Sequence, residues 1–468
     1  MKKIVYDELM ELNKGYINTF NALYNLKTFE ENEIDKIYQD IKLNLIETKI
    51  LFPDQILEAI GVASKFNNKY LKSYWAIFKK LFEEYRPNKF RSENSIINYF
   101  VYKEYGHFIN KRDLDLFNVF EKQNISLDVH ESNTIFRAIM DDNKILFISF
   151  IESEGFNDKM QLSSMFYPDK LLSLLELCCY HGAVNCFKLL RTKFKSTITQ
   201  RCLHYSFLGG NPDIMNECMK EQNPDKICMR YAIISHNIDF VSFLMNEHNI
   251  EIDLDDCLTF KNLHALFVNF DQKDDINTFF LYSSTFNIPS LCEYLLLQGA
   301  DVNTRNDEGL TALHFAAREN CPETTQFLIL HNADINVTAK LMQLTALDIA
   351  VMYNYVRAVE VLLLNGANAN AKAYDGSSML HMAAGHGSKE TAELLISHGA
   401  EINAKDNNGA TPLHIAAQYN FKDMAELLVS HGAVINAKDY KNMTPFYNAI
   451  YGNCIETTEY LKSLGAKI

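Results

Sequence analysis

Apolar residues recur at helical spacing through the first part of the chain. One stripe is formed by Ile34, Ile37, Ile41 and Leu45. Their intervals of three and four predict an amphipathic helix that Pro53 ends. A second stripe runs from Tyr70 to Tyr85 and stops at Pro87, and a third covers Ile96 to Tyr105. We therefore predict an N-terminal helical region over residues 1–130.

Residues 131–276 show a shorter repeat, in which a helix, a Gly or Asn break and a second helix follow one another. Matching positions at Tyr180, Gly209 and Ser235 are 29 and 26 residues apart. This spacing predicts helix pairs that stack on one another but lack a projecting hairpin.

A longer phrase returns along the last two-fifths of the chain. Thr411-Pro412-Leu413-His414 has counterparts that begin at Thr311, Thr345, Ser378 and Thr444, so the five starts lie 34, 33, 33 and 33 residues apart. A Gly-Ala or Asn-Ala dipeptide closes each unit in step. The chain is thus predicted to end in an array of repeats.

Each position of this phrase has a physical role. The Thr or Ser is expected to cap the first helix, and the Leu and the small Ala pair to pack inside the stack. The closing glycine is expected to be left-handed and to end the second helix. Asn303, Asn336, Asn370, Asn403 and Asn436 follow the dipeptide and suit bonds between neighbouring loops. His314, His381 and His414 lie one per repeat, too far apart to share a metal ion, so each is expected to bond its own Thr or Ser or the next loop.

A period of 33 with T-P-L-H-x-A resembles the ankyrin signature. The resemblance implies six ankyrin repeats in residues 277–468, whose first helices begin at Thr278, Thr311, Thr345, Ser378, Thr411 and Thr444. The fold class is then an all-α solenoid with short β-turn fingers, preceded by degenerate finger-less helix pairs and the helical N-terminal region. The blocks at 16–42, 171–194, 206–215, 231–247 and 286–303 also resemble ankyrin-repeat proteins of parasitic protists with a helical N-terminal domain of unknown function. That resemblance implies no reaction.

The third repeat departs from the pattern. It has one extra residue, its finger Lys340-Leu341-Met342-Gln343 lacks glycine, and Asp348 replaces the histidine. We expect an irregular, more apolar finger there, with different partner contacts or a locally weaker stack. In the sixth repeat the second helix is polar, as suits a terminal cap.

Charge and cysteine usage narrow the function classes. The net charge is −14, from 45 basic and 59 acidic residues, which argues against nucleic acid as a partner. The N-terminus does not resemble a secretory signal, and no apolar stretch approaches the ~20 residues of a membrane span. Ten cysteines without a C-x-x-C pair indicate buried, reduced thiols. We expect a cytoplasmic protein, with the nucleus as the alternative.

No arrangement of residues indicates chemistry. We predict no catalytic residue, no cofactor, no metal ligand and no small-molecule substrate, since no nucleophile–base pair or phosphate loop can be named. Gly385-His386-Gly387-Ser388-Lys389 falls at a break between helices, and the lone Trp75 lies inside a helical stripe, as a core aromatic does. Two functions remain: a non-enzymatic scaffold or adaptor that binds a protein partner, or an enzyme or enzyme-regulatory protein whose site in residues 1–276 is not recognised.

On the scaffold hypothesis, a partner contacts the positions between the motif residues, on the concave face of the array. These predicted partner-binding residues are Asp307, Glu308, Arg318, Glu319, Leu341, Met342, Met352, Tyr353, Tyr374, Asp375, His386, Asn407, Asn408, Gln418, Tyr419, Tyr440, Lys441 and Tyr451. Tyr353, His386 and Tyr419 share one column, and Tyr451 is displaced by one position. Amphipathic rings on a rigid support are typical anchors for a partner. The alternative is an ordinary solvated surface.

Overall fold

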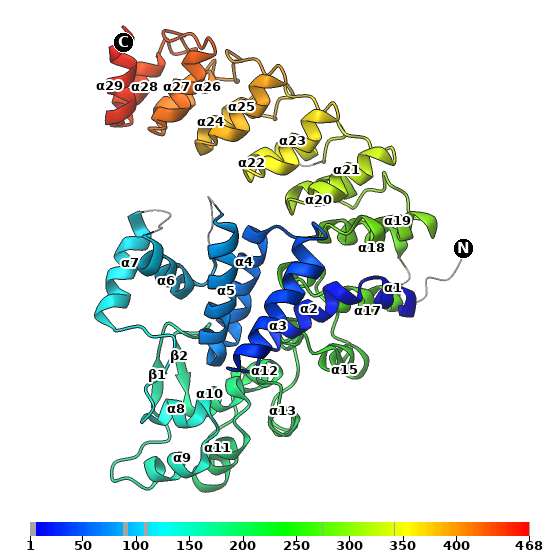
Figure 1. Cartoon of the computed structure of the whole chain (residues 1–468), viewed down its shortest axis with the longest axis vertical. Coiled ribbons are helices and arrows are strands. Elements are labelled where there is room, and N and C mark those ends of the chain that lie inside the picture. The colour runs from blue at the N-terminus through cyan, green and yellow to red at the C-terminus, as the bar shows by residue number, and fades with distance from the viewer. Residues whose placement is uncertain (1–5, 88–91, 107–110, 274, 341, 468) are drawn as a thin grey trace. The chain divides into compact units, whose positions relative to one another are not determined.

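The structure, a computed structural model, describes residues 6–87, 92–106, 111–273, 275–340 and 342–467. The chain divides into two compact units, which we name the N-terminal unit (Val5–Asp274) and the C-terminal unit (Asp275–Ile468). Both are built from helices (Figure 1). The sequence-based boundary at residue 130 falls inside the N-terminal unit, and the three-part division stays a prediction.

Seven helices open the N-terminal unit. They are α1 (Tyr6–Leu12), α2 (Lys14–Tyr24), α3 (Glu31–Ile41), α4 (Pro53–Phe66), α5 (Leu71–Tyr85), α6 (Ser95–Tyr105) and α7 (Lys111–Lys122). The end of α5 before Pro87 and of α6 at the left-handed Gly106 are as predicted. Trp75 is a core residue, buried and stacked on Phe78.

The role predicted for Pro53 is wrong. The helix that contains Ile34 and Ile41 continues through a π-helical turn and stops at Ile46. Pro53 instead occupies the first position of α4, where its missing N–H costs no hydrogen bond. The same residue type can end one helix or begin the next, and the apolar stripe alone does not decide which.

Helix pairs make up the rest of the N-terminal unit. They are α8 (Ile135–Met140) with α9 (Lys144–Ile151), α10 (Leu174–His181) with α11 (Val184–Leu189), α12 (Gln200–Gly209) with α13 (Pro212–Met219), α14 (Lys226–Ile234) with α15 (Ile238–His248), and α16 (Leu254–Thr259) with α17 (Leu263–Lys273). The first helices α8, α10, α12, α14 and α16 pack in sequence order, so the predicted stack is present. The expectation that no hairpin projects is wrong at one place, because β1 (Gln161–Ser163) and β2 (Leu171–Ser173) pair antiparallel before α10.

A row of tyrosines joins these pairs to the opening helices. Tyr180, Tyr205 and Tyr231 come from α10, α12 and α14, and neighbouring rings lie 5.5 and 5.6 Å apart. The hydroxyl of Tyr180 donates to the carbonyl of Phe66 at 2.9 Å, at the end of α4. The Phe66 ring meets Tyr231 edge-on at 6.3 Å. The end of α4 therefore packs against the first helices of the same unit.

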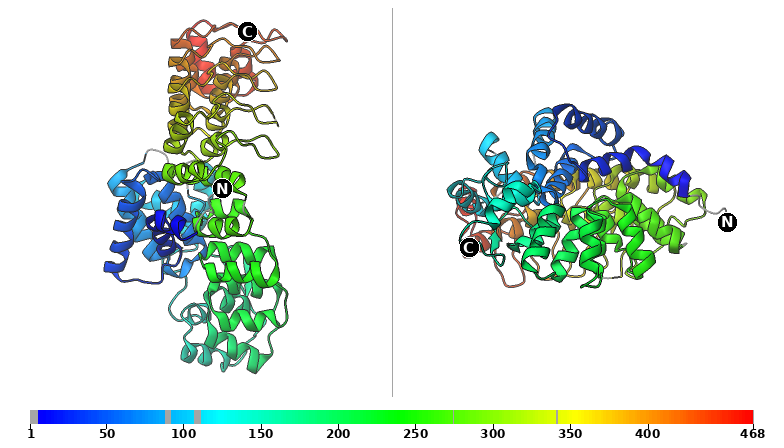
Figure 2. Two further views of the ribbon diagram at one scale, coloured as in Figure 1. Left: turned by 90° about the vertical axis from the view of Figure 1, so that its right-hand side faces the viewer. Right: turned by 90° about the horizontal axis from the view of Figure 1, so that it is seen from below.

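The C-terminal unit contains six helix pairs within its described residues. The first helices are α18 (Ile276–Ser283), α20 (Ala312–Arg318), α22 (Ala346–Met352), α24 (Met379–His386), α26 (Pro412–Gln418) and α28 (Pro445–Tyr451). The second helices are α19 (Pro289–Leu297), α21 (Pro322–Leu330), α23 (Val356–Leu364), α25 (Lys389–Ser397), α27 (Lys422–Ser430) and α29 (Ile455–Ser463). First helices line one side of this unit and second helices the other (Figure 1), and the connecting fingers project from its edge (Figure 2, left).

Two side chains tie neighbouring repeats together, as between the fifth and the sixth. Nδ1 of His414 accepts from the backbone N–H of Thr411 at 3.1 Å, and its Nε2 lies 3.0 Å from the carbonyl oxygen of Met443 in the following finger. The carboxamide of Asn403 donates to the carbonyl of Gly432 at 3.1 Å and accepts from the N–H of Val434 at 2.9 Å. Both predicted roles are confirmed.

The start predicted for the first repeat is wrong. Asp275, not Thr278, caps α18, because its carboxylate accepts hydrogen bonds from the N–H groups of Asn277 and Thr278. Thr278 thus lies inside the first turn. An aspartate at this position satisfies the same backbone donors as Thr or Ser, so the repeat register placed the helix but not its cap.

Candidate partner-binding face

The finger tips form one edge of the predicted face. Each finger is a turn closed by a backbone hydrogen bond, for example from the N–H of Asp406 to the carbonyl of Ala410 at 3.0 Å. Successive fingers are also bonded to one another: the N–H of Asn407 donates to the carbonyl of Asp375, and the N–H of Tyr440 to that of Asn408. Some tip side chains are also bonded within the array: Asp375 accepts from the hydroxyl of Ser377 at 3.0 Å, and the carboxamide of Asn407 donates to the carbonyl of Tyr374 at 3.3 Å. The exposed tip residues are Asp307, Glu308, Met342, Tyr374, Asp375, Asn407, Asn408, Tyr440 and Lys441.

The finger before α22 is irregular. Its closing bond joins the N–H of Ala339 to the carbonyl of Leu344, five residues apart where Asp406 and Ala410 are four apart. The extra residue of the third repeat therefore lies here. Met342 and Gln343 both have positive φ, 60° and 53°, which side chains with a Cβ seldom adopt. The predicted partner residue Leu341 lies outside the described residues.

The ends of the first helices form a second edge. Tyr353 and Tyr419 cap α22 and α26, His386 is the last residue of α24, and Tyr451 the last of α28. Tyr353, Tyr419 and Tyr451 are 55%, 56% and 85% exposed. Met352 and Gln418 are exposed beside them. Since a first helix of seven residues rises ~10 Å, the finger edge and the helix-end edge are separate parts of the face.

Arg318 and Glu319 are less available than predicted. Nε of Arg318 lies 3.4 Å from the carboxylate of Glu319, and its guanidinium stands over the ring of Phe315 at 4.9 Å. Both are half-buried. Within the described residues they pair with each other at the end of α20, where the third and fifth repeats have Tyr353 and Tyr419 in place of Glu319.

The helix pairs of the C-terminal unit match a known protein family. Residues 280–373, 359–439 and 380–468 match the family described as "Ankyrin repeats (3 copies)". The chain carries ankyrin repeats. Residues 194–269 match a second family, described as "Domain of unknown function (DUF3447)". Ankyrin repeats are protein–protein interaction modules.

Two mouse proteins (Mus musculus) share part of the sequence. The B-cell lymphoma 3 protein homolog is 38% identical over 87 residues, and the nuclear factor NF-kappa-B p105 subunit is 38% identical over 88 residues. Each match covers 19% of this chain, and only 19% and 9% of the two relatives.

Solved ankyrin repeat domains align with the chain over 40% of its length. A domain from Acinetobacter baumannii AYE is 27% identical, with 98% of its own chain covered and a TM-score of 0.38. The human ASB11 ankyrin repeat domain is 24% identical, with 84% of its chain covered and a TM-score of 0.37.

No described helix has the length and apolar character needed to cross a bilayer.

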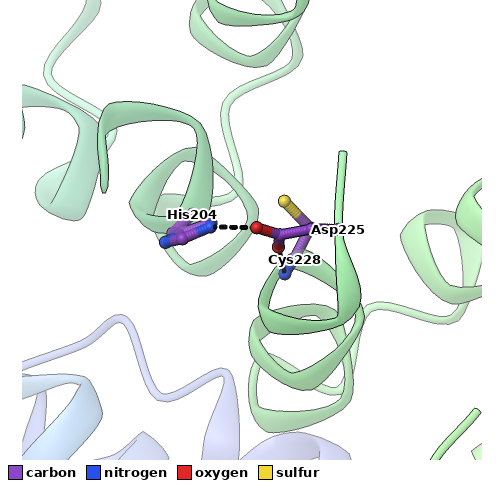
Figure 3. A group of neighbouring side chains, drawn as sticks. All are labelled: His204, Asp225 and Cys228. Atoms are coloured by element: carbon purple, nitrogen blue, oxygen red, sulfur yellow. Dashed lines mark hydrogen bonds and ion pairs between the residues drawn. The ribbon is translucent and has the colours of Figure 1, made fainter. Parts of the chain in front are cut away.

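One group of described residues outside the ankyrin repeats has the side chains of a metal site. Suitable atoms of His204, Asp225 and Cys228 lie within 4.8 Å of one another (Figure 3). Asp225, however, is the N-cap of α14: its Oδ1 accepts from the N–H groups of Ile227 and Cys228, and its Oδ2 lies 2.8 Å from Nε2 of His204.

The electrostatics of this group also favour a structural role. Partial burial alone would raise the pKa of Asp225, but the hydrogen bonds from His204 and the backbone lower it overall. Burial raises the pKa of the Cys228 thiol to about 12, so it is protonated at neutral pH. The group is therefore structural: Asp225 caps α14 and bonds His204 of the neighbouring helix α12.

Sequence reasoning missed one set of exposed residues on the ankyrin repeats. Leu297, Leu330 and Leu364 are the last residues of α19, α21 and α23, and all three are exposed. They sit directly after the aliphatic residues that fill the core, so composition alone assigns them to packing. The repeat register could have distinguished these leucines from core residues, because Ser397 and Ser430 occupy the same position in later repeats.

Proposed function

We propose that this protein is a non-enzymatic scaffold whose ankyrin repeats hold a protein partner on the face made by the finger tips and the ends of the first helices. It acts in the cytoplasm, where its ten free and buried cysteines stay reduced. The partner-binding side chains are the described members of the predicted set, with Tyr353 and Tyr419 as its anchors.

One observation carries this proposal. In the same helices, the motif residues are buried and the residues between them are exposed: Leu413 and Ala416 of α26 lie in the core, while Tyr419 at its end is more than half exposed. Exposed tyrosine rings add apolar contact area and a hydroxyl at small entropic cost, which is why such residues act as anchors at interfaces.

The N-terminal unit offers an internal precedent. There, Tyr180 near the end of α10 and Tyr205 in the middle of α12 are buried, and the end of α4 contacts Tyr180. The Tyr180 hydroxyl donates to the carbonyl of Phe66 at 2.9 Å and lies 3.2 Å from that of Lys65, both at the C-terminal end of α4. Tyr353 and Tyr419 present the same chemistry in exposed form. A helix end or loop with free carbonyl groups is the segment that they suit.

The charged side chains on the finger edge indicate the charge of the partner surface. The second and fourth repeats present Asp307, Glu308 and Asp375, whereas the third presents Lys340 and the sixth Lys441. Unlike charges attract across an interface and steer association. A basic partner surface therefore suits the first part of this edge.

Affinity purification of the intact protein tests the proposal. We compare the wild type with Tyr353→Ala/Tyr419→Ala, using Tyr105→Ala of the N-terminal unit as a matched tyrosine control. Loss of one or more proteins from the double variant alone supports the face. An unchanged set of bound proteins, with both variants folded by circular dichroism, refutes it. Turnover of a substrate by the purified protein would refute the non-enzymatic assignment.

A further inference from the structure

Three exposed leucines form a row on the side of the C-terminal unit opposite the first helices. Leu297, Leu330 and Leu364 are 78%, 69% and 68% exposed. Each is the last residue of a second helix, and α19, α21 and α23 pack side by side (Figure 1). We call these three residues the leucine row.

Folding does not require leucine at this position. The equivalent residues of α25, α27 and α29 are Ser397, Ser430 and Ser463. Each serine hydroxyl donates to a carbonyl of its own helix, such as that of Leu394 for Ser397 at 2.9 Å. A position that accepts serine in three repeats holds exposed leucine in the other three, and grouped exposed apolar side chains mark interaction sites.

Negative charge borders the leucine row on both sides. Glu293 and Glu360 lie one helical turn before Leu297 and Leu364, and Asp301 and Asp334 lie four residues after Leu297 and Leu330. All four are exposed. The sequences of α19 and α21 contain no Lys or Arg, and α23 contains one basic residue, the half-buried Arg357. The surroundings therefore complement an apolar segment that carries positive charge on its flanks.

The spacing of the row fits a helix that lies along the array. Packed helices are ~8–10 Å apart, and seven residues of a helix rise ~10.5 Å. An apolar residue at every seventh position of a partner helix thus meets one leucine per repeat, and residues three or four positions away reach the acidic borders. We propose that the leucine row is a second docking site, which binds a basic amphipathic helix of a protein partner.

A synthetic helical peptide tests this site on the full chain. The probe has about 18 residues, with Leu at every seventh position, Lys three and four residues from each Leu, and Ala elsewhere. Its binding is measured by fluorescence anisotropy. Leu297→Ser/Leu330→Ser/Leu364→Ser is the decisive variant, because serine is the chain's own residue at this position. We expect binding about tenfold weaker per leucine removed, and weaker binding of the wild type at high salt.

The reciprocal variant Ser397→Leu extends the row by one repeat and is expected to tighten binding of a peptide lengthened by seven residues. Equal binding by wild type and the triple serine variant would overturn the proposal, as would equal binding of a peptide with Glu in place of Lys. Sedimentation measures the oligomeric state. If the wild type is a dimer and the triple serine variant is a monomer, the leucine row binds a second copy of this chain, and the proposal of a basic helix is overturned. Tyr353→Ala/Tyr419→Ala leaves peptide binding unchanged if the two faces are separate, and weakened binding there would also overturn the site.

Discussion

Nε2 of His381 lies 2.9 Å from the carbonyl oxygen of Ala410, the last residue of the following finger. On its other side, Nδ1 of the same ring accepts from the N–H of Ser378, at the start of its own helix, at 3.1 Å. The ring therefore carries its proton on Nε2 and joins two repeats. His314 and His414 make the same pair of bonds.

Replacing His381 by alanine is expected to destabilise the C-terminal unit by about 1–3 kcal/mol, because a buried N–H and a carbonyl lose their partner. Urea unfolding followed by circular dichroism measures the effect. His386→Ala, on the exposed end of the same helix, is the control and is expected to change little. Equal effects of the two variants would show that the ring does not join the repeats.

The same histidines predict a pH dependence. Burial lowers the pKa of His314, His381 and His414 below the ordinary value, and the carbonyls of Leu344, Ala410 and Met443 offset this only in part. The unfolded chain, with an imidazole pKa of ~6.5, then binds more protons than the folded one. Stability is full above that pH and falls as the pH drops from there toward the folded pKa.

Urea midpoints at pH 7.5 and pH 5.5 test this dependence. A variant with glutamine at all three positions is expected to lose less stability on acidification than the wild type. The comparison is needed because burial also lowers the pKa of His130 and His236 in the N-terminal unit. Identical losses in both proteins would contradict the assignment.

Asp348 breaks the series of histidines. Its Oδ2 accepts from the N–H of Thr345 at 2.8 Å, but its Oδ1 is buried without a hydrogen-bond partner among the described residues. Burial raises the pKa of this carboxyl. Asp348→His is expected to restore the bond to the next finger and to raise the free energy of unfolding by about 1 kcal/mol. Asp423→His, at an exposed position of α27, is the control, and a thermal melt that ranks the two variants equally would contradict the expectation.

Tyr180 offers a test of the N-terminal unit. Tyr180→Phe keeps the ring but leaves the carbonyl of Phe66 without its donor, so we expect a loss of about 1–2 kcal/mol. Hydrogen exchange should also be faster in α4. Tyr102→Phe, at a half-buried position of α6, is the comparison. Unchanged exchange in α4 would mean that the row of tyrosines does not hold it.

Sequence periodicity predicted the parts of this fold that repeat. Leu413, Ala416 and His414 recur in register, and each recurrence reports the same packing, so their burial and bonds could be foreseen. Single events could not: Pro53 begins a helix rather than ending one, and Asp275 caps α18 in place of Thr278. Where a helix starts and which residue caps it depend on local hydrogen bonds, and more than one nearby residue can satisfy the same backbone N–H groups.

The candidate site was predictable in a more limited way. Register identified Tyr353 and Tyr419 as positions that packing leaves free, and both are exposed. The leucine row was hidden because its residues continue the aliphatic run of Leu295 and Leu363, which are core residues. The pairing of Arg318 with Glu319 depends on side-chain geometry, which periodicity does not report.

Site-specific photo-cross-linking tests the central claim most directly. A benzoylphenylalanine residue is placed at Tyr419, on the proposed face, or at Ser430, on the second helix of the same repeat. In extracts of cells that express the full chain, we predict a discrete cross-linked protein from position 419 and none from position 430. Cross-links of equal yield from both positions, or from position 430 alone, would contradict the claim that the exposed residues between the ankyrin motif positions bind the partner.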